Sequence, residues 1–362
     1  MPKPDSMHFT KSILSWHDSD PDRRPMPWRG IKDPYAIWLS EVILQQTRVE
    51  QGWKYYERFI QAYPKVEDLA NASEDEVLAQ WKGLGYYSRA RNLHATAKKV
   101  SDELKGEFPK KKAELLKLKG VGDYTASAIA SFAFNEPNAV LDGNVIRILA
   151  RYFGIEGDIR DTKTKKELQN LADSLIAVDR PAEYNQAIMD FGSMQCTPQK
   201  PNCTQCPLSE SCYAFAEGKV SSLPFKSKPK EKVHRYFHFI LLPSPSGGFW
   251  LQKRTAKDIW QNLYQPLLVE SDKILSPNGL INEMDQDQRS GLGIEELEIY
   301  PKAYKQTLSH QIIHARFYQS PSLIKKMDAD TEWRELRREN LDTFALPKVV
   351  DCYFLDDWLN LE

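Results

Sequence analysis

The spacing of the apolar residues changes once along this 362-residue chain, and that change limits the folds open to it. From about Phe9 to Phe215 the apolar residues recur at helical spacing. After the Lys- and Pro-rich stretch PFKSKPKEKVHR, β-prone runs separated by Pro, Ser and Gly replace that pattern. We therefore predict a multidomain chain, with an all-α domain over 1–223, a basic linker over 224–235 and an α+β domain over 236–362.

Three stretches carry more local predictions. The apolar run over 34–56 predicts one continuous helix with Glu41, Gln45 and Arg48 along a thin polar stripe. The segment RYFHFILLPSPSGGFWLQKR predicts a β-hairpin, because two β-prone runs flank a Pro, Ser and Gly cluster. The segment DTEWRELRRENL over 330–341 predicts a late helix.

Composition excludes some classes of function. The apolar content of 41% and the charged content of 27% are those of an ordinary globular protein. No apolar run approaches the ~20 residues of a membrane span, and no signal-peptide pattern follows Met1, so we expect a cytoplasmic protein with no membrane partner. A monomer is the default expectation. The net charge of -1 provides no basic field, so any affinity for nucleic acid must come from local geometry.

Four of the five cysteines lie in one short segment, CTPQKPNCTQCPLSESC, over 196–212. Without an export signal, disulfides are disfavoured and metal ligation is favoured. Zinc ribbons usually present two separated C-x-x-C knuckles, whereas one compact run is closer to the ligation of an iron-sulfur cluster. We predict a 4Fe-4S cluster, with zinc as the alternative; the ligands would be Cys196, Cys203, Cys206 and Cys212. Cys352 stands apart, as a small core residue.

Two glycines interrupt the helical pattern in LKGVGDYTASAIASF. Gly120 and Gly122 would permit a tight turn between two helices over about 113–134. The turn would direct the unpaired amides of the second helix outward, and these amides with the helix dipole can hold a phosphate. Lys117 and Lys119 would add to that affinity. A helix connection without any ligand is the alternative.

Two acidic residues stand in contrasting surroundings. Glu41 lies in strongly apolar sequence, where burial raises the pKa of a carboxyl group toward the range of a general acid. Asp142 precedes the amphipathic helix pattern of VLDGNVIRILARYFG, where a simple N-cap is the alternative. Two carboxyl groups in different environments are the usual means of cleaving a glycosidic bond.

Five segments occur in a characteristic order: SEVILQQTRV, GLGYYSRARN, LKGVGDYTA, VLDGNVIRILAR and the four-cysteine loop. This ordered set resembles the helix-hairpin-helix DNA glycosylases that carry an iron-sulfur cluster. Among these, the chain is most similar to the adenine DNA glycosylases of the MutY family. The resemblance implies that Glu41 protonates the purine at N7 and that Asp142 stabilises the oxocarbenium-like sugar. Asn144 and Tyr124 would support them.

The resemblance also implies the residues that bind the DNA. Trp28, Arg29 and Gln186 would line the adenine pocket that receives the flipped base. Tyr86 and Gln46 would wedge beside the opposing base, where flat side chains can replace lost stacking.

One position separates this interpretation from its nearest rival. Endonuclease III-like enzymes excise oxidised pyrimidines and carry a Lys nucleophile two residues after the second hairpin glycine, where this chain has Tyr124. The resemblance therefore implies a monofunctional glycosylase, a hydrolase of base excision repair that uses water. An endonuclease III-like glycosylase and lyase is the alternative, and a silent DNA-binding or redox module is a third hypothesis.

The second domain resembles the Nudix-like domain that reads 8-oxoguanine in adenine glycosylases. Residues 236–362 lack the G-x5-E-x7-RE pattern, so we expect binding without nucleotide hydrolysis. The family's aromatic-Ser-His loop corresponds to Leu308, Ser309 and His310, and Leu308 weakens any stacking at the first position. The expected substrate is double-stranded DNA with adenine opposite 8-oxoguanine or guanine.

Overall fold

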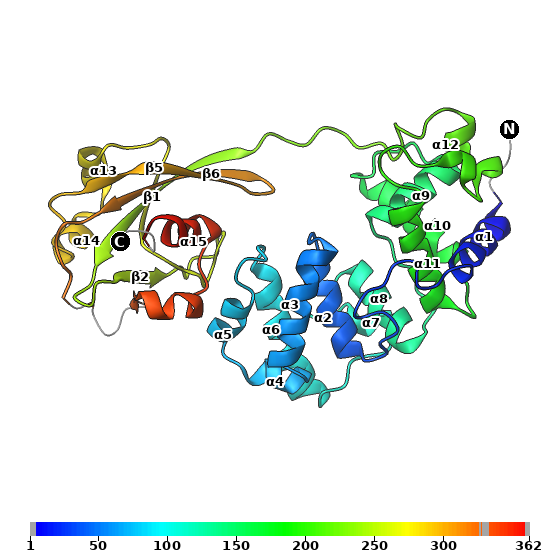
Figure 1. Ribbon diagram of the computed structural model, residues 1–362, viewed down its shortest axis with the longest axis horizontal. Helices are drawn as coiled ribbons and strands as arrows, with labels where there is room; N and C mark the ends of the chain where they lie inside the picture. The colour runs from blue at the N-terminus through cyan, green and yellow to red at the C-terminus, as the bar shows by residue number, and fades with distance from the viewer. Residues whose placement is uncertain (1–4, 326, 328–332, 359–362) are drawn as a thin grey trace. The chain divides into compact units, whose positions relative to one another are not determined.

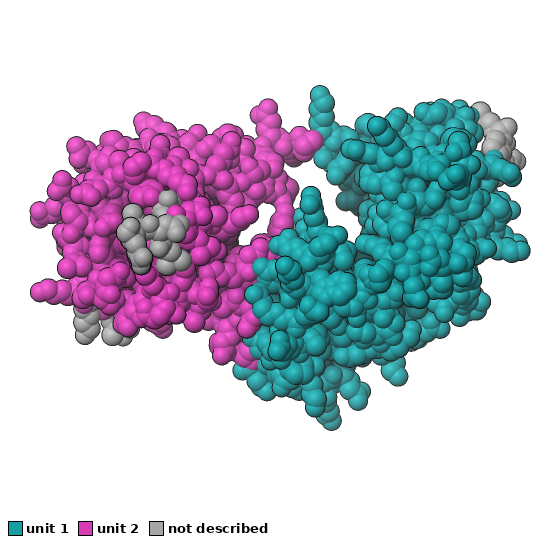
Figure 2. All heavy atoms as spheres, in the orientation of Figure 1, with its two compact units in different colours: residues 1–71, 92–228 teal, residues 72–91, 229–362 magenta. Residues whose placement is uncertain are grey.

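The computed structural model describes residues 5–325, 327 and 333–358. It divides into two compact units that do not follow the order of the chain (Figures 1 and 2). The first unit comprises Met1–Asn71 and Asn92–Lys228, and the second comprises Ala72–Arg91 and Pro229–Glu362. Among the described helices, none has the length and hydropathy that crossing a bilayer requires.

The described part of the first unit is helical, which confirms the all-α prediction for this part of the chain. Figure 1 shows α1 beside α9, α10 and α11. The helices, in chain order, are α1 (Ser6–Asp18), α2 (Pro34–Leu44), α3 (Val49–Ala62), α4 (Val66–Asn71), α6 (Ser88–Leu104, whose first residues belong to the second unit), α7 (Lys112–Leu115), α8 (Asp123–Phe134), α9 (Gly143–Phe153), α10 (Thr162–Leu175), α11 (Pro181–Met194), the 3-10 turns η1 (Cys203–Gln205) and η2 (Ser209–Ser211), and α12 (Tyr213–Ala216).

The core of this unit forms where α1, α9 and α11 pack together. The ring of Phe9 lies 4.8 Å from that of Tyr152 and 5.3 Å from that of Phe153, measured between centroids. Phe191 of α11 joins the same buried cluster. Burying side chains of this size contributes about 1.5–3 kcal/mol each, so this packing fixes α9 and α11 relative to one another.

The single helix predicted over 34–56 is wrong. Helix α2 ends at Leu44 and α3 begins at Val49, because Gln46 adopts a left-handed backbone conformation with φ of 57°. The predicted polar stripe therefore does not exist, since Gln45 and Arg48 cap the two helix ends. Only Glu41 stays in the helix, and nine of its residues, Tyr35 through Ile43, are buried.

The second unit is built on a mixed sheet whose described strands follow the order β3-β2-β1-β6-β5, with β4 paired to β1 and β7 to β2. The strands are β1 (Val233–Pro243), β2 (Phe249–Lys253), β3 (Tyr264–Gln265), β4 (Leu267–Ser271), β5 (Glu298–Thr307), β6 (Gln311–Gln319) and β7 (Trp333–Leu336). β1 and β6 run parallel, and every other described pair is antiparallel. The β1–β2 pairing, with Leu242 opposite Trp250, confirms the predicted hairpin.

Helices cover parts of both faces of this sheet. On one face Phe239 and Phe317 pack with Tyr353 of α15 (Lys348–Tyr353), followed by the π-helical turn η4 (Phe354–Trp358). On the other face Ile240 and Tyr318 pack with α13 (Pro277–Glu283), which precedes α14 (Gln286–Gly291).

The helix predicted over 330–341 is wrong wherever it is described. Trp333–Leu336 forms β7 and pairs with β2, and Arg338–Thr343 forms the 3-10 helix η3. Residues 330–332 lie outside the described residues. Backbone pairing with β2 overrides the local helical preference, which is weak in a short segment.

Residues 72–91, which include α5 (Glu74–Gln80), belong to the sheet-containing unit although they come from the first part of the chain. The Lys82 ammonium lies 2.9 Å from the Asp351 carboxylate, and the Tyr87 hydroxyl donates to the Leu346 carbonyl at 3.2 Å. The segment that carries Tyr86 is therefore held by the same unit that carries the β5–β6 turn.

Candidate active site and iron-sulfur loop

The helical unit contains a cavity of about 680 Å³ between the loop that follows α1 and helices α2, α8, α9 and α11. Side chains far apart in the sequence meet there because the four helices pack around it. Eight of the residues predicted for the site line this cavity: Trp28, Arg29, Glu41, Gln46, Tyr124, Asp142, Asn144 and Gln186.

Glu41 is nearly buried, with 9% of its surface exposed, because α2 is enclosed on almost every side. Burial raises the pKa of Glu41 to about 7, a hydrogen bond with Tyr124 acts in the opposite direction, and the charge of Asp142 adds to the rise. A carboxyl group with this pKa holds a proton near neutral pH and can still release it, which suits a general acid.

Asp142 is held by its position at the start of α9. Its Oδ1 accepts hydrogen bonds from the backbone N–H groups of Asn144 and Val145, both at 2.8 Å, and its Oδ2 accepts one from the Asn144 side chain at 2.7 Å. The N-cap interpretation is thus correct, and the same carboxylate also lines the cavity. These three N–H donors hold both oxygens of the Asp142 side chain in place.

Tyr124 stands at the first turn of α8 and interacts with both Glu41 and Asp142. Its hydroxyl lies 3.6 Å from the sulfur of Met189 and forms a hydrogen bond with Glu41. Burial raises the pKa of Tyr124 well above its ordinary value, so the phenol stays protonated. It can therefore orient the Glu41 carboxyl but supplies no amine.

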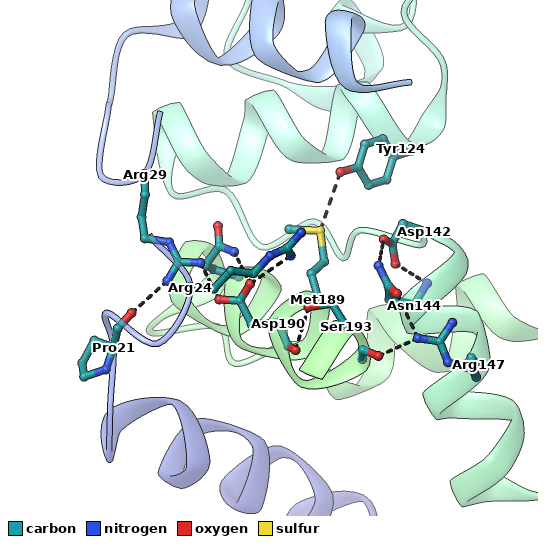
Figure 3. A network of polar contacts seen from close by, with 12 residues as sticks. Pro21, Arg24, Arg29, Tyr124, Asp142, Asn144, Arg147, Met189, Asp190 and Ser193 are labelled. Atoms are coloured by element: carbon teal, nitrogen blue, oxygen red, sulfur yellow. Dashed lines mark hydrogen bonds and ion pairs between the residues drawn. The ribbon is translucent and has the colours of Figure 1, made fainter. Parts of the chain in front are cut away.

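A buried ion-pair network supports the opposite wall of the cavity (Figure 3). Asp190 of α11 accepts from Arg29 at 2.5 Å, from Arg24 at 3.3 Å and from the Gln186 side chain at 3.2 Å. The Nε of Arg29 is buried and, among the described residues, has no hydrogen-bond partner. A buried donor without a protein partner is rare in folded proteins.

Sequence reasoning missed Arg24, Met189 and Asp190. Arg24 and Met189 line the cavity, and Asp190 sits behind it holding both arginines. Asp190 follows Gln186 by one helical turn, which is the one local signal that the two side chains share a face. Nothing local links Asp190 to Arg24, since 166 positions separate them.

Trp28 is held in place by aromatic side chains of α3. Its ring makes edge contacts with Tyr56 at 5.4 Å and with Trp53 at 6.4 Å, measured between centroids. Such pairs contribute about 0.5–1.5 kcal/mol beyond the area that they bury, so the ring is fixed where it lines the cavity.

Tyr86, Ser309 and His310 belong to the other unit and do not line this cavity. Tyr86 is exposed and has a left-handed backbone with φ of 50°, as Gln46 does with φ of 57°. Residues other than Gly rarely adopt this backbone conformation, and such strain concentrates at functional sites. The Tyr86 hydroxyl lies 3.0 Å from the Ser309 hydroxyl, and Ser309 and His310 form the exposed turn between β5 and β6.

The two hairpin glycines differ in their roles. Gly120 has φ of 78°, and a Cβ there would lie 2.7 Å from the Cβ of Asn92, so glycine is required. Gly122, the N-cap of α8, has an extended backbone that any residue adopts, and a Cβ there would meet nothing within 4 Å. The predicted need for glycine to make the turn is therefore met at Gly120 alone.

The four clustered cysteines are all free and partly buried. Cys196, Cys206 and Cys212 pack against the core next to α9 and α11. In the part of the chain that the structure describes, no three Cys, His, Asp or Glu side chains lie close enough to hold a single metal ion. Four thiols on one short loop are the donor set that an iron-sulfur cluster takes.

Arginines of α9 connect the cysteine loop to the cavity. Arg147 donates to the Cys196 carbonyl at 2.7 Å and to the Asn144 side chain at 2.9 Å, and Asn144 in turn contacts Asp142 (Figure 3). Arg151 lies 3.4 Å from the Cys196 sulfur and donates to the Thr197 carbonyl at 2.7 Å. The loop and the Asp142 carboxylate are thus joined by a short chain of hydrogen bonds.

Residues 39–174 match the HhH-GPD superfamily of base excision DNA repair proteins, and residues 196–212 match the iron-sulfur binding domain of endonuclease III. These matches confirm the predicted helical domain and show that Cys196, Cys203, Cys206 and Cys212 belong to an iron-sulfur site. Among solved structures, a thermostable thymine-DNA glycosylase is 32% identical with a TM-score of 0.54, covering 59% of this chain and 97% of its own.

Curated relatives cover more of the chain. The human adenine DNA glycosylase is 45% identical over 235 residues, which cover 60% of this chain and 42% of the human protein. The adenine DNA glycosylase of Buchnera aphidicola from Acyrthosiphon pisum is 38% identical over 256 residues, covering 71% of this chain and 73% of the relative. With its paired carboxyl groups and iron-sulfur loop in place, the chain belongs to the adenine DNA glycosylase family.

Proposed function

We propose that the protein is a monofunctional glycosylase that hydrolyses the N-glycosidic bond of adenine opposite 8-oxoguanine, or opposite guanine, in double-stranded DNA. The observation that carries the proposal is the pair of carboxyl groups on one cavity, of which Glu41 is buried with its pKa raised to about 7 and Asp142 is held by three N–H donors. Glycosidic bonds are cleaved by such a pair, in which one group donates a proton and the other stabilises the sugar cation.

Glu41 acts on the leaving base. Its carboxyl group donates a proton to N7 of the flipped adenine, so that the base departs as a neutral molecule. Tyr124 keeps the proton available by bonding to the carboxyl group. Glu41 itself is shielded from bulk water, since it lies on a helix that is buried on nearly every side.

Asp142 acts on the sugar. As the bond breaks, positive charge develops on the deoxyribose, and the fixed carboxylate stabilises it without reorganisation. Asn144 holds the second oxygen of that carboxylate at 2.7 Å, and Arg147 holds Asn144. These contacts make Asn144 a positioning residue for Asp142.

A water molecule, rather than an amine of the protein, completes the reaction. Tyr124 takes the place where the lyases carry their nucleophilic Lys. The lysine of the cavity lining, Lys32, directs its ammonium to the Phe132 carbonyl at 3.3 Å, near the far end of α8 from Tyr124. No Schiff base is therefore expected, and the product is an abasic site.

The flipped adenine lies between Trp28 and the side of the cavity formed by Arg24 and Arg29, which we call the arginine wall. The ring of Trp28 provides a stacking surface, and the side chains of Arg29 and Gln186 contact the polar edge of the base. Asp190 holds the Arg29 guanidinium in place.

Recognition of the opposing base is assigned to Gln46, Tyr86, Ser309 and His310. Gln46 and Tyr86 would wedge beside that base, and Ser309 and His310 would provide hydrogen bonds to 8-oxoguanine. The contact between Tyr86 and Ser309 supports a shared role for these two residues. The sheet-containing unit, Nudix-like in our interpretation, then acts as a reader without hydrolysing nucleotides.

The remaining predicted residues hold the DNA backbone. The open space beside Gly122 at the N-terminus of α8 leaves room for a phosphate, which the Gly120 turn presents to the helix amides.

A 4Fe-4S cluster on the four cysteines supplies iron-thiolate bonds that cross-link the loop over 196–212 when bound.

A single-turnover assay on labelled duplexes tests the proposal. Four duplexes carry adenine opposite 8-oxoguanine, adenine opposite guanine, thymine opposite guanine and thymine glycol opposite adenine, and each reaction is stopped with and without hot alkali. We expect breaks at the adenine of the first two duplexes, only after alkali, and fastest opposite 8-oxoguanine.

Two outcomes would contradict it. Breaks without alkali on the thymine glycol duplex would assign the chain to the lyases. Equal rates opposite guanine and 8-oxoguanine would leave the glycosylase but remove the proposed reading of the opposing base.

A further inference from the structure

One face of the sheet carries a cluster of rings and cations that the proposed reaction does not use. We call it the histidine face, and it consists of His234 and Tyr236 of β1, Lys305 of β5, and His314 and Arg316 of β6. Tyr236 is paired with His314 across the parallel strands, and Lys305 is paired with His314 across the antiparallel ones. The residues share one side because alternate residues of a strand point the same way.

The rings of this face are ordered by contact with one another. The Nδ1 atom of His234 lies 3.0 Å from the Nε2 atom of His314, which is hydrogen-bond distance. The ring of Tyr236 lies 4.8 Å from that of His314, with 15° between their planes. The face is therefore preformed, and little side-chain entropy would be lost when a ligand binds it.

Helices cover only part of this side of the sheet. Farther along the strands, Ile240 and Tyr318 lie under α13 and its neighbours. His238 is also buried there, and its ring accepts from the Leu275 backbone N–H at 3.1 Å. At the other end of the strands His234 and Lys305 are exposed, so the histidine face is open to a macromolecule.

Neither Lys305 nor Arg316 forms an ion pair with a described residue. On the reverse side of the same strands, Arg235 is neutralised by Asp258 at 2.7 Å and by Glu270 at 2.5 Å. The described strand positions of the histidine face carry no acidic residue. The one hydrogen bond that the Arg316 side chain makes with a described residue goes to the Pro301 carbonyl, at 2.8 Å. Two imidazoles so close together suggest a metal site, but the neighbouring Lys305 and Arg316 repel a dication and attract an anion.

The position of the face within the unit indicates which anion. Lys305 and His314 lie on the two strands of the β5–β6 hairpin, and the turn of that hairpin carries Ser309 and His310. Three adjacent strands span about 10 Å, which is the axial rise of about three nucleotides of one DNA strand.

We propose that the histidine face binds the phosphodiester backbone of duplex DNA next to the base that the hairpin turn reads. The proposal rests on the proposed function for the position of the turn, but it requires only that the protein bind DNA. Phosphate contacts of this kind position a protein on the duplex without reading sequence.

Fluorescence anisotropy of the full chain with a labelled lesion-free duplex, titrated at several salt concentrations, tests it. We expect Lys305→Ala to weaken binding about 3- to 10-fold at low salt and to lower the slope of log K against log salt by about one. The double variant His234→Ala/His314→Ala should weaken binding by a similar factor. Lys305→Arg should restore it.

Lys302→Ala is the matched control. Lys302 lies on the same strand, but its ammonium is 3.3 Å from the Asp356 carboxylate and packs over the Tyr304 ring. Equal losses for the Lys302 and Lys305 variants would show a general charge effect and overturn the proposal. Unchanged affinity in both the Lys305 and the double His variant would also overturn it, and would leave the face to a different polyanion, such as an acidic protein segment.

A second readout separates this proposal from the proposed function. At saturating duplex, Lys305→Ala should excise adenine at the wild-type single-turnover rate, because the cavity residues are untouched. If the wild-type protein excises no adenine, the proposed function fails. The titration with lesion-free duplex still tests whether the histidine face binds DNA. Circular dichroism thermal scans of each variant identify any loss of affinity that arises from unfolding.

Discussion

The two carboxyl groups of the cavity are held in opposite ways. Glu41 sits in the interior of a buried helix with a phenol beside it, so burial dominates and raises its pKa to about 7. Asp142 sits at a helix start, where backbone and side-chain N–H groups bond to both of its oxygens. The environment of each group, rather than its chemical type, thus gives Glu41 a pKa suited to donating a proton and holds Asp142 in a fixed position.

Glu41→Gln should lower the excision rate more than any other variant considered. Glutamine keeps the shape but has no acidic proton, so we expect the single-turnover rate on the adenine duplex to fall by about 10²- to 10⁴-fold. Affinity for the duplex should stay within a few-fold. A variant that keeps wild-type excision would remove Glu41 from the mechanism.

Asp142→Asn should remove the charge and preserve the cap. Asparagine still accepts from the Asn144 and Val145 backbone, so folding should be retained while the rate falls by about 10²- to 10³-fold. Asp161→Asn at the N-cap of α10 is the control, since its side chain makes no cap hydrogen bond. If both variants slow excision equally, Asp142 acts only through the helix.

The pH dependence of excision should report the Glu41 proton. With a pKa of about 7, the fraction of protonated Glu41 falls about tenfold per pH unit above that value, and the single-turnover rate should fall with it. The Glu41→Gln variant should lose this falling limb. A wild-type rate that stays level up to pH 9 contradicts the assignment of the acid.

The same group should make stability depend on pH. The pKa of Glu41 is higher in the folded protein than its ordinary value of 4.5, so the folded state binds more protons between these limits. Stability should therefore be highest for this group below about pH 4.5 and should fall by up to about 3 kcal/mol as pH rises through about 7. Urea unfolding of wild type and Glu41→Gln, below pH 4.5 and above pH 7, measures this change in the free energy of unfolding. The variant should lack the change.

Tyr124→Phe should have the smallest effect, a shift in the pH dependence of excision. Its hydroxyl lowers the pKa of Glu41, so removing it should move the falling limb to higher pH, by about one unit or less for a hydrogen bond of about 1 kcal/mol. Tyr35→Phe is the control, because the Tyr35 hydroxyl donates to the Tyr63 carbonyl outside the cavity. A shift to lower pH would contradict the assigned direction.

Local pattern was sufficient for several features. The cysteine spacing indicated the iron-sulfur loop, Asp142 was recognisable as a helix cap, and Pro, Ser and Gly between β-prone runs marked the β1–β2 hairpin. Each of these features depends on residues close together in the chain. The conflict between short-range preference and backbone pairing explains the wrong helix at β7, where β2 satisfies the backbone groups of Trp333–Leu336.

The sequence by itself determined the class of each half of the chain, the iron-sulfur ligands and the family, because periodicity and motif spacing are local properties. Only the tertiary structure decided the break at Gln46, the arginine wall on Asp190, and the placement of residues 72–91 with the sheet. These features join side chains that are distant along the chain. Packing of the helices and strands brings them together, and no short window of sequence records that packing.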